Sequence, residues 1–224
     1  MFSESLLLTL KVALVTTIIL LLVSTPIAWW VVSLKKRYRV LVEAVLALPL
    51  ILPPTVLGFY LLIILNPEGL ISSAFRSLGF SGQLTFNFTG LVIGSVVYSL
   101  PFAIQPLVSA FSKVPKIYLD SAKLLGAGSF DRFISIVLPL SKGGFVLGGV
   151  LSFAHTIGEF GVVMMIGGNI PGVTRVVSID IYNQVEALNF HRAHELSLLM
   201  LLFSLVVLVI VYSINLRGQG RRND

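Results

Sequence analysis

Two ionisable side chains, His155 and Glu159, interrupt one of the apolar stretches of this sequence. They are four residues apart, so a helix would place both on one face. An ionisable group at membrane depth costs on the order of 3 kcal/mol unless it is paired or wet, so we expect both to face the protein interior. Because a buried carboxylate is costly unless it is paired, Glu159 is predicted to bond to backbone or hydroxyl donors across a subunit interface and to shape a gate. His155 is expected to pack beside it with one ring nitrogen satisfied.

The same residues leave two other chemistries open. His155 and Glu159 could form the proton relay of a secondary transporter. Ser152 and His155, three residues apart on one helix face, could belong to an intramembrane hydrolase, although no third orienting group or nucleophile turn accompanies them. The sequence has no cysteine, which excludes disulfides and thiolate metal ligands. It also has no Gly-rich loop followed by Lys and Ser or Thr of the ATP-binding kind. We therefore predict no catalytic residue and expect no metal or cofactor.

The elements that must position these residues are apolar stretches. Of the 224 residues, 56% are hydrophobic and only 12% are charged, against roughly 25% charged in soluble domains. Stretches of 18 or more apolar residues can cross the hydrocarbon layer of about 30 Å. We expect an all-α integral membrane protein with one domain over residues 1–224, built as a bundle of five transmembrane helices. The spans are predicted near residues 12–34, 42–65, 88–112, 143–166 and 196–216.

The second span contains three prolines within a stretch of six residues: Pro49, Pro53 and Pro54. They leave backbone carbonyls without a hydrogen-bond donor and kink the helix. Within a membrane, such carbonyls must be hydrogen-bonded by neighbouring helices or by water in a cavity. Pro53, Pro54 and the following Thr55 are therefore candidates for the pore or gate, together with His155 and Glu159. A simple structural kink is the alternative.

The basic residues of the loops predict the orientation of the chain. Twelve of the sixteen Lys and Arg residues fall on one side of a five-span arrangement, namely Lys35, Lys36, Arg37, Arg39, Lys113, Lys116, Lys123, Arg132, Lys142, Arg217, Arg221 and Arg222. The positive-inside rule then places the N-terminus outside, the C-terminus in the cytoplasm and the loop of residues 113–139 on the cytoplasmic side. The net charge of +6 records this orientation, and no nucleic-acid partner is expected.

The cytoplasmic loop has the pattern of a helical hairpin. Val114-Pro115 can open a helix over residues 117–125, and Gly126-Ala127-Gly128 can end it in a turn. A second helix over residues 130–137 is predicted to stop before Pro139. Small residues of the first helix and the turn would allow a partner's backbone to approach closely.

This loop resembles the EAA signature of ABC importer permeases. The matching positions are Asp120-Ser121-Ala122, then Gly126 after three residues, Ile136 after nine more, and Leu138-Pro139 after one more. Asp120 and Ser121 stand where Glu and Ala are usual. The resemblance implies that the first helix docks in a cleft of a separate cytoplasmic ATPase. It makes Asp120, Ser121, Ala122, Gly126, Ala127 and Gly128 the predicted coupling residues. It also implies a homodimer embedded in membrane lipid, an external substrate-binding protein, and a place in the plasma (inner) membrane of a prokaryote.

Two further segments indicate the substrate class. Both resemble molybdate permeases. The first is residues 48–60, and the second is Gly158-Glu159-Phe160-Gly161 together with Asn169-Ile170-Pro171-Gly172. Sulfate, thiosulfate and tungstate permeases share parts of these patterns, so sulfate and tungstate are the alternatives to molybdate. No basic residue lies within a predicted span, and Arg forks that hold oxyanions tightly are thus absent there. We expect a passage of low affinity, with recognition by the binding protein.

Overall fold

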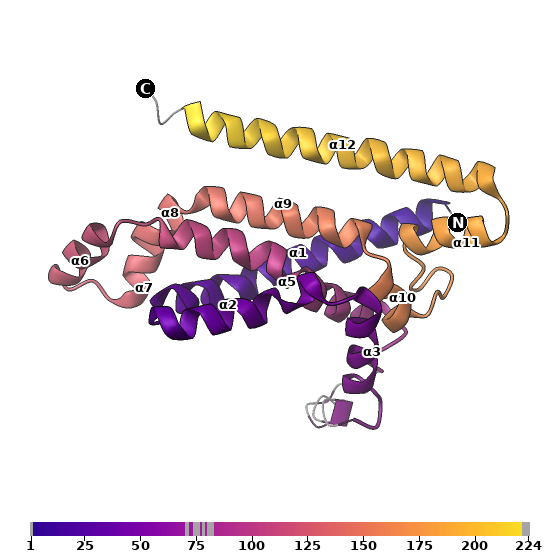
Figure 1. Cartoon of the computed structure of the whole chain (residues 1–224), viewed down its shortest axis with the longest axis horizontal. Helices are drawn as coiled ribbons and strands as arrows, with labels where there is room; N and C mark the ends of the chain where they lie inside the picture. The colour runs from indigo at the N-terminus through magenta and orange to yellow at the C-terminus, as the bar shows by residue number, and fades with distance from the viewer. Residues whose placement is uncertain (1, 70–71, 74–76, 78, 80–82, 221–224) are drawn as a thin grey trace.

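The computed structural model is helical along most of its length (Figure 1). It describes the chain except for residues 1, 70–71, 74–76, 78, 80–82 and 221–224. In chain order its helices are α1 (Phe2–Ser33), α2 (Lys36–Ile51), α3 (Pro54–Ile64), α5 (Phe88–Ser112), α6 (Lys116–Leu124), α7 (Ser129–Arg132), the π-helix η1 (Phe133–Val137), α8 (Leu138–Leu140), α9 (Lys142–Gly158), α10 (Gly161–Gly167), α11 (Val177–Glu186) and α12 (Phe190–Gly220).

Three of these helices are each long and apolar enough to cross a membrane: Glu4–Ser33, Phe88–Ser112 and Phe190–Ile210. They correspond to the first, third and fifth predicted spans. Two bent helix pairs could each form one more span, namely α2 with α3, and Ser129–Leu140 with α9. The all-α membrane fold is confirmed, and the number of spans in the described part of the chain lies between three and five.

The second predicted span, residues 42–65, is not one kinked helix. Its two halves, α2 and α3, meet at 107°. Pro53 and Pro54 have no N–H with which to continue α2, and Pro53 takes an extended ψ of 133° before Pro54 opens α3. The prolines thus act where predicted, but the turn exceeds a right angle and α3 leaves the bundle sideways (Figure 1).

The fourth predicted span, residues 143–166, is also divided. α9 ends at Gly158, Glu159 is extended with ψ 132°, Phe160 has φ −127°, and α10 begins at Gly161. At the break, the Ser178 hydroxyl of α11 donates a hydrogen bond of 2.6 Å to the carbonyl oxygen of Glu159. A side chain therefore satisfies a backbone group that the helix no longer pairs, as a membrane interior requires.

The core of the bundle is the packing of α1, α5 and α9. Gly148 of α9 allows a close approach to α5, since a Cβ added there would lie 2.9 Å from the carbonyl oxygen of Ala103. Nearer to α6 the core is aromatic. Phe111 is 2% exposed, and its ring lies 6.2 Å from that of Trp29 and 5.8 Å from that of Phe133. These contacts hold α5 against α1 and against the end of the hairpin.

The long helix α12 runs beside the bundle rather than within it (Figure 1). Between α12, α1 and α9 lies an apolar cavity of about 290 Å³, lined by Thr17, Gly149, Val150, Phe153, Val207 and Ile210. Most large apolar side chains of residues 201–210 are exposed. A helix with such a surface is suited to contact with lipid, where no hydrophobic force drives it into the bundle.

Candidate functional site

The predicted coupling loop is a helical hairpin at one end of the bundle (Figure 1). Helix α6 ends in a Schellman motif, in which the Gly126 N–H donates to the Lys123 carbonyl at 3.0 Å and the Ala127 N–H to the Ala122 carbonyl at 2.9 Å. Gly126 has a φ of +86°, a left-handed conformation that glycine adopts without steric strain. The turn predicted at Gly126-Ala127-Gly128 is confirmed.

The predicted stop before Pro139 is wrong. Helices α7, η1 and α8 follow one another without a break from Ser129 to Leu140. Proline cannot donate the backbone hydrogen bond that an α-helix needs at that position. The π-helix η1, residues 133–137, comes directly before α8 and widens the winding there, which accommodates the missing donor. The return arm of the hairpin therefore runs up to Ser141, where the chain bends into α9.

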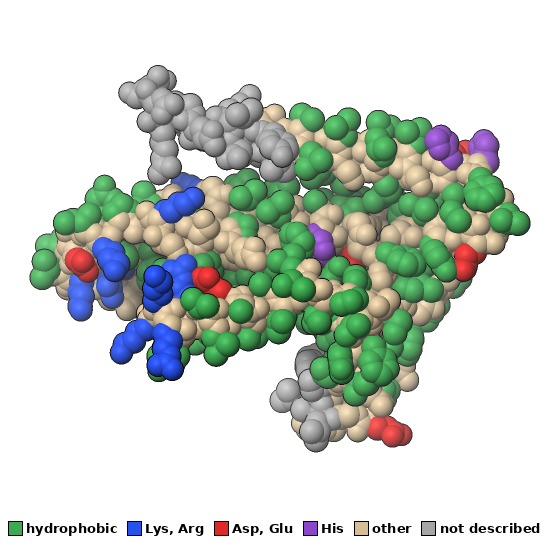
Figure 2. All heavy atoms as spheres, in the orientation of Figure 1, with side chains coloured by type: hydrophobic (Ala, Val, Ile, Leu, Met, Phe, Trp, Pro, Cys, Tyr) green, Lys and Arg blue, Asp and Glu red, His purple; other side chains and the backbone are tan. Residues whose placement is uncertain are grey.

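All six predicted coupling residues lie on this hairpin. Asp120, Ser121, Gly126 and Gly128 are exposed, whereas Ala122 and Ala127 are half-buried. Leu119 packs against the aromatic core around Phe111 and fixes α6 to the bundle. Lys and Arg side chains gather at the same end of the molecule (Figure 2). The structure thus keeps the motif accessible on a surface that is suited to water and not to lipid.

Sequence reasoning missed the apolar surface of the hairpin. Four large side chains, which we call the hairpin patch, are exposed by 69%, 90%, 88% and 76%: Ile117, Leu124, Leu125 and Phe130. On a surface rich in Lys and Arg, several large exposed apolar side chains are typical of a protein contact. The sequence does contain a signal for this surface, because these apolar residues lie within a charged loop.

The candidate pore residues Pro53, Pro54 and Thr55 lie at the corner between α2 and α3. Pro53 and Thr55 are exposed. Pro54 contacts the start of α10, because a Cβ added at Gly161 would lie 2.6 Å from the Pro54 Cβ. The two breaks of the chain, one at the prolines and one after α9, therefore touch each other in the structure.

His155 is packed as expected. Its Nδ1 lies 2.9 Å from the Ser99 hydroxyl of α5, and its ring stacks on Phe102 with a centroid distance of 4.0 Å and an interplanar angle of 24°. The Tyr98 ring lies 4.7 Å away. One ring nitrogen is thus satisfied and the ring faces are covered by aromatic residues, as in a structural histidine.

Glu159 faces the protein interior, as predicted. Its side chain is 3% exposed, and neither carboxylate oxygen has a hydrogen-bond partner among the described residues. The Ser95 hydroxyl of α5 interacts with the carboxyl without reaching hydrogen-bond geometry. The described residues of the protomer therefore supply no hydrogen bond to this carboxyl, and its bonding to donors across a subunit interface stays a prediction.

The arrangement does not support a Ser-His hydrolase. Ser152 is buried and donates to the Gly148 carbonyl at 2.7 Å, while His155 is bonded to Ser99 instead. A nucleophile must be hydrogen-bonded to its base, and this pair is not. Among the described residues, no hydrogen bond or ion pair joins His155 to Glu159 either. A direct proton relay would need such a bond, so the arrangement does not support one.

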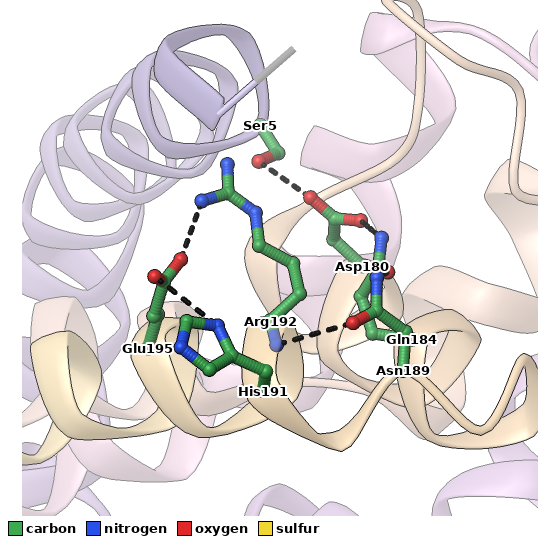
Figure 3. A network of polar contacts seen from close by, with 7 residues as sticks. All are labelled: Ser5, Asp180, Gln184, Asn189, His191, Arg192 and Glu195. Carbon is green, nitrogen blue, oxygen red and sulfur yellow. Dashed lines mark hydrogen bonds and ion pairs between the residues drawn. The ribbon is translucent and has the colours of Figure 1, made fainter.

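A polar network joins three helices at the end of the bundle opposite to the hairpin (Figure 3). Ser5 of α1 donates to Asp180 of α11 at 3.1 Å, and Gln184 donates to the same carboxyl at 3.3 Å. The network continues through Asn189 to Arg192, which pairs with Glu195 of α12 at 2.6 Å. It fixes α11 and the start of α12 to α1, so we assign it a structural role.

Comparison with known proteins places this geometry in a family. Residues 13–222 match the family described as "Binding-protein-dependent transport system inner membrane component", and the chain belongs to it. The membership confirms the class of transport permease that the EAA-like spacing predicted.

Relatives extend over most of the chain. It is 51% identical to the molybdenum transport system permease protein ModB of Azotobacter vinelandii over 206 residues, which covers 92% of this chain and 91% of that protein. ModB of Escherichia coli K12 is 33% identical over 82% of this chain and 80% of its own length. A probable sulfate transport system permease protein, cysT of Chlorella vulgaris, is 29% identical over 92% of this chain and 76% of that protein.

A solved structure has the same fold. A chain of the bacterial alginate ABC transporter, crystallised with an alginate-bound periplasmic protein, superposes with a TM-score of 0.75 at 15% identity. The match covers 96% of this chain and 78% of that chain.

Proposed function

We propose that this chain is the membrane permease subunit of an ATP-driven importer of molybdate. The observation that carries the proposal is the 51% identity to a molybdenum permease over nearly the full length of both chains. The similarity to a sulfate permease is lower, at 29%, so sulfate is the weaker alternative. The pore itself does not hydrolyse ATP in this proposal, and energy comes from a separate ATPase subunit.

The hairpin is the proposed docking element for that ATPase. It carries the motif residues on an accessible surface, and the hairpin patch supplies the apolar area that a partner's groove would bury. At roughly 25 cal/mol per Å² of apolar area, a few exposed leucines are enough to contribute several kcal/mol to such a contact. Two copies of this chain would form the pathway between them, with an external binding protein at the opposite end.

The proposed orientation puts the hairpin in the cytoplasm and the network around Asp180 outside. Its support is the distribution of Lys and Arg, which gather at the hairpin end (Figure 2). In the same orientation the N-terminus of α1 is external, and α12 returns to the cytoplasmic side with Arg217 near its end.

Transport by the reconstituted complex tests the substrate. The chain would be purified with its ATPase partner, placed in proteoliposomes and supplied with the binding protein, ATP and labelled molybdate. We expect ATP-dependent molybdate uptake that unlabelled molybdate and tungstate reduce more strongly than sulfate does. Uptake of labelled sulfate that molybdate does not reduce would reject molybdate as the substrate and favour the sulfate alternative.

A further inference from the structure

The free surface of α5 differs from that of α1. Every exposed residue of α5 is polar: Thr89, Gln105, Ser109 and Ser112. By contrast, the exposed residues of α1 between positions 12 and 32 are all apolar: Leu14, Ile18, Leu22, Val23, Pro26 and Trp30. An exposed amide or hydroxyl at membrane depth requires water or a polar partner, whereas an exposed leucine is suited to lipid. The exposed face of α5 is therefore not a lipid-facing surface.

Three of these residues form one stripe. Gln105, Ser109 and Ser112 are spaced by four and three residues, so they lie on one face of α5 over a length of about 10 Å. We call them the α5 stripe. Gly94 lies eleven residues before Gln105 and so on nearly the same face. There α10 covers the helix, because a Cβ added at Gly94 would lie 2.7 Å from Ile166. The same face is thus closed by α10 at one end and open toward the hairpin at the other.

The two ends of the stripe are chemically distinct. At the hairpin end, Arg39 of α2 donates to the Ser112 hydroxyl at 2.9 Å and pairs with Glu43 at 2.7 Å. Toward α10, the next residues on this face are Phe102 and Tyr98, whose rings contact His155. The stripe therefore leads from the guanidinium of Arg39 at the hairpin end to the rings of Phe102 and Tyr98, which pack on His155.

We propose that Gln105 and Ser109 line the inner half of the anion pathway and bind the passing oxyanion through hydrogen bonds of their amide and hydroxyl groups. The proposal rests on the proposed function and adds the pathway residues to it. Both side chains offer neutral donors to oxyanion oxygens. Without a fixed positive charge they hold the anion weakly, which allows its release into the cytoplasm.

Water access to the stripe is the direct test, and the chain's lack of cysteine makes it simple. Single cysteines at Gln105 and Ser109 would be exposed, in inside-out vesicles holding the complete transporter, to an anionic thiol reagent that does not cross membranes. Ile18→Cys, 50% exposed on α1, is the lipid-facing control, and Lys36→Cys, exposed at the start of α2 and outside the hairpin, is the water-exposed control. Labelling after denaturation confirms that each thiol is present.

We expect Gln105→Cys and Ser109→Cys to react, and Ile18→Cys to react at least about tenfold more slowly, because the reactive thiolate does not form in hydrocarbon. Molybdate at high concentration should slow the reaction at both stripe positions and leave Lys36→Cys unchanged. If the two stripe cysteines stay as unreactive as Ile18→Cys while Lys36→Cys is labelled, the stripe is dry and the proposal is overturned. Reactive stripe cysteines that sulfate protects and molybdate does not would keep the pathway and reject molybdate as the substrate.

Discussion

At the scale of single residues, substitutions at Gly126 can separate the left-handed conformation that the turn requires from a direct contact with the ATPase. Its φ is +86°, and a Cβ added there would meet no atom within 4 Å. The glycine therefore serves the turn and not a close approach within this chain. A left-handed conformation costs an ordinary L-residue roughly 1–2 kcal/mol, and less for Asn. We predict that Gly126→Val weakens both ATPase binding and uptake roughly fivefold or more, whereas Gly126→Asn retains most of both.

Co-purification of the ATPase and uptake into vesicles measure this effect. Gly143→Ala is the matched control, because Gly143 lies on α9 outside the motif and an added Cβ would meet no atom within 4 Å. Equal losses in the Gly126→Val and Gly126→Asn variants would show that the turn conformation is not what matters at this position.

Glu159 is the second residue for which the structure sharpens the prediction. Its carboxyl is buried without a hydrogen-bond partner, and an unsatisfied ionisable group at this depth destabilises the fold. Glu159→Gln should therefore leave the thermal stability unchanged or higher, while it alters the rate of transport. It should not alter the order of preference among molybdate, tungstate and sulfate, since a carboxylate is ill suited to holding an anion.

Asp180→Ala is the comparison for Glu159→Gln, because that carboxyl is also buried but accepts bonds from Ser5 and Gln184. Its removal takes the carboxyl acceptor away from both groups and should cost about 1–3 kcal/mol of stability. Thermal unfolding of both variants in detergent gives the stabilities, and competition uptake gives the preference. A changed preference order in Glu159→Gln would place this residue in substrate selection.

At the scale of elements, the sequence predicted the helices and turns that depend on residues near each other in the chain. It did not predict the features that depend on contacts between distant helices. Long apolar stretches predicted α1, α5 and α12, and the Gly126 turn followed from local backbone chemistry. The prolines predicted a bend after α2 but not its 107°, because the direction of α3 is set by its packing on α10, about one hundred residues away. The unpaired state of Glu159 and the exposed face of α5 also require knowledge of which helices meet.

The crossing of α3 and α10 yields an element-scale prediction. A Cβ added at Gly58 of α3 would lie 2.7 Å from the Met165 Cβ of α10, so a larger side chain must push the two helices apart. Overpacking of this kind typically costs 1–3 kcal/mol. We predict that Gly58→Val lowers the midpoint of thermal unfolding. Gly143→Ala on α9, where no atom lies within 4 Å of the added Cβ, should leave it unchanged. A Gly58→Val protein as stable as the parent would contradict the close crossing.

At the scale of the whole molecule, the orientation in the membrane is open to a simple test. Ala187, exposed after α11, and Leu124, 90% exposed on the hairpin, lie at opposite ends of the bundle. In whole cells, an impermeant thiol reagent should label Ala187→Cys and spare Leu124→Cys. In inside-out vesicles the pattern should reverse. Labelling of Leu124→Cys from outside would invert the proposed topology and remove the hairpin from the cytoplasm.

The central claim is that ATP hydrolysis on a partner drives an anion through this chain by way of the hairpin. The decisive measurement is molybdate uptake by the reconstituted complex, energised either by ATP or by a proton gradient alone, with Leu124→Glu compared with Leu124→Met. Since Leu124 is exposed, both variants should fold and insert. The account predicts uptake with ATP only, retained in Leu124→Met and lost in Leu124→Glu together with ATPase binding. Uptake that runs on the proton gradient without the ATPase, and is indifferent to Leu124→Glu, would contradict it and favour a secondary transporter.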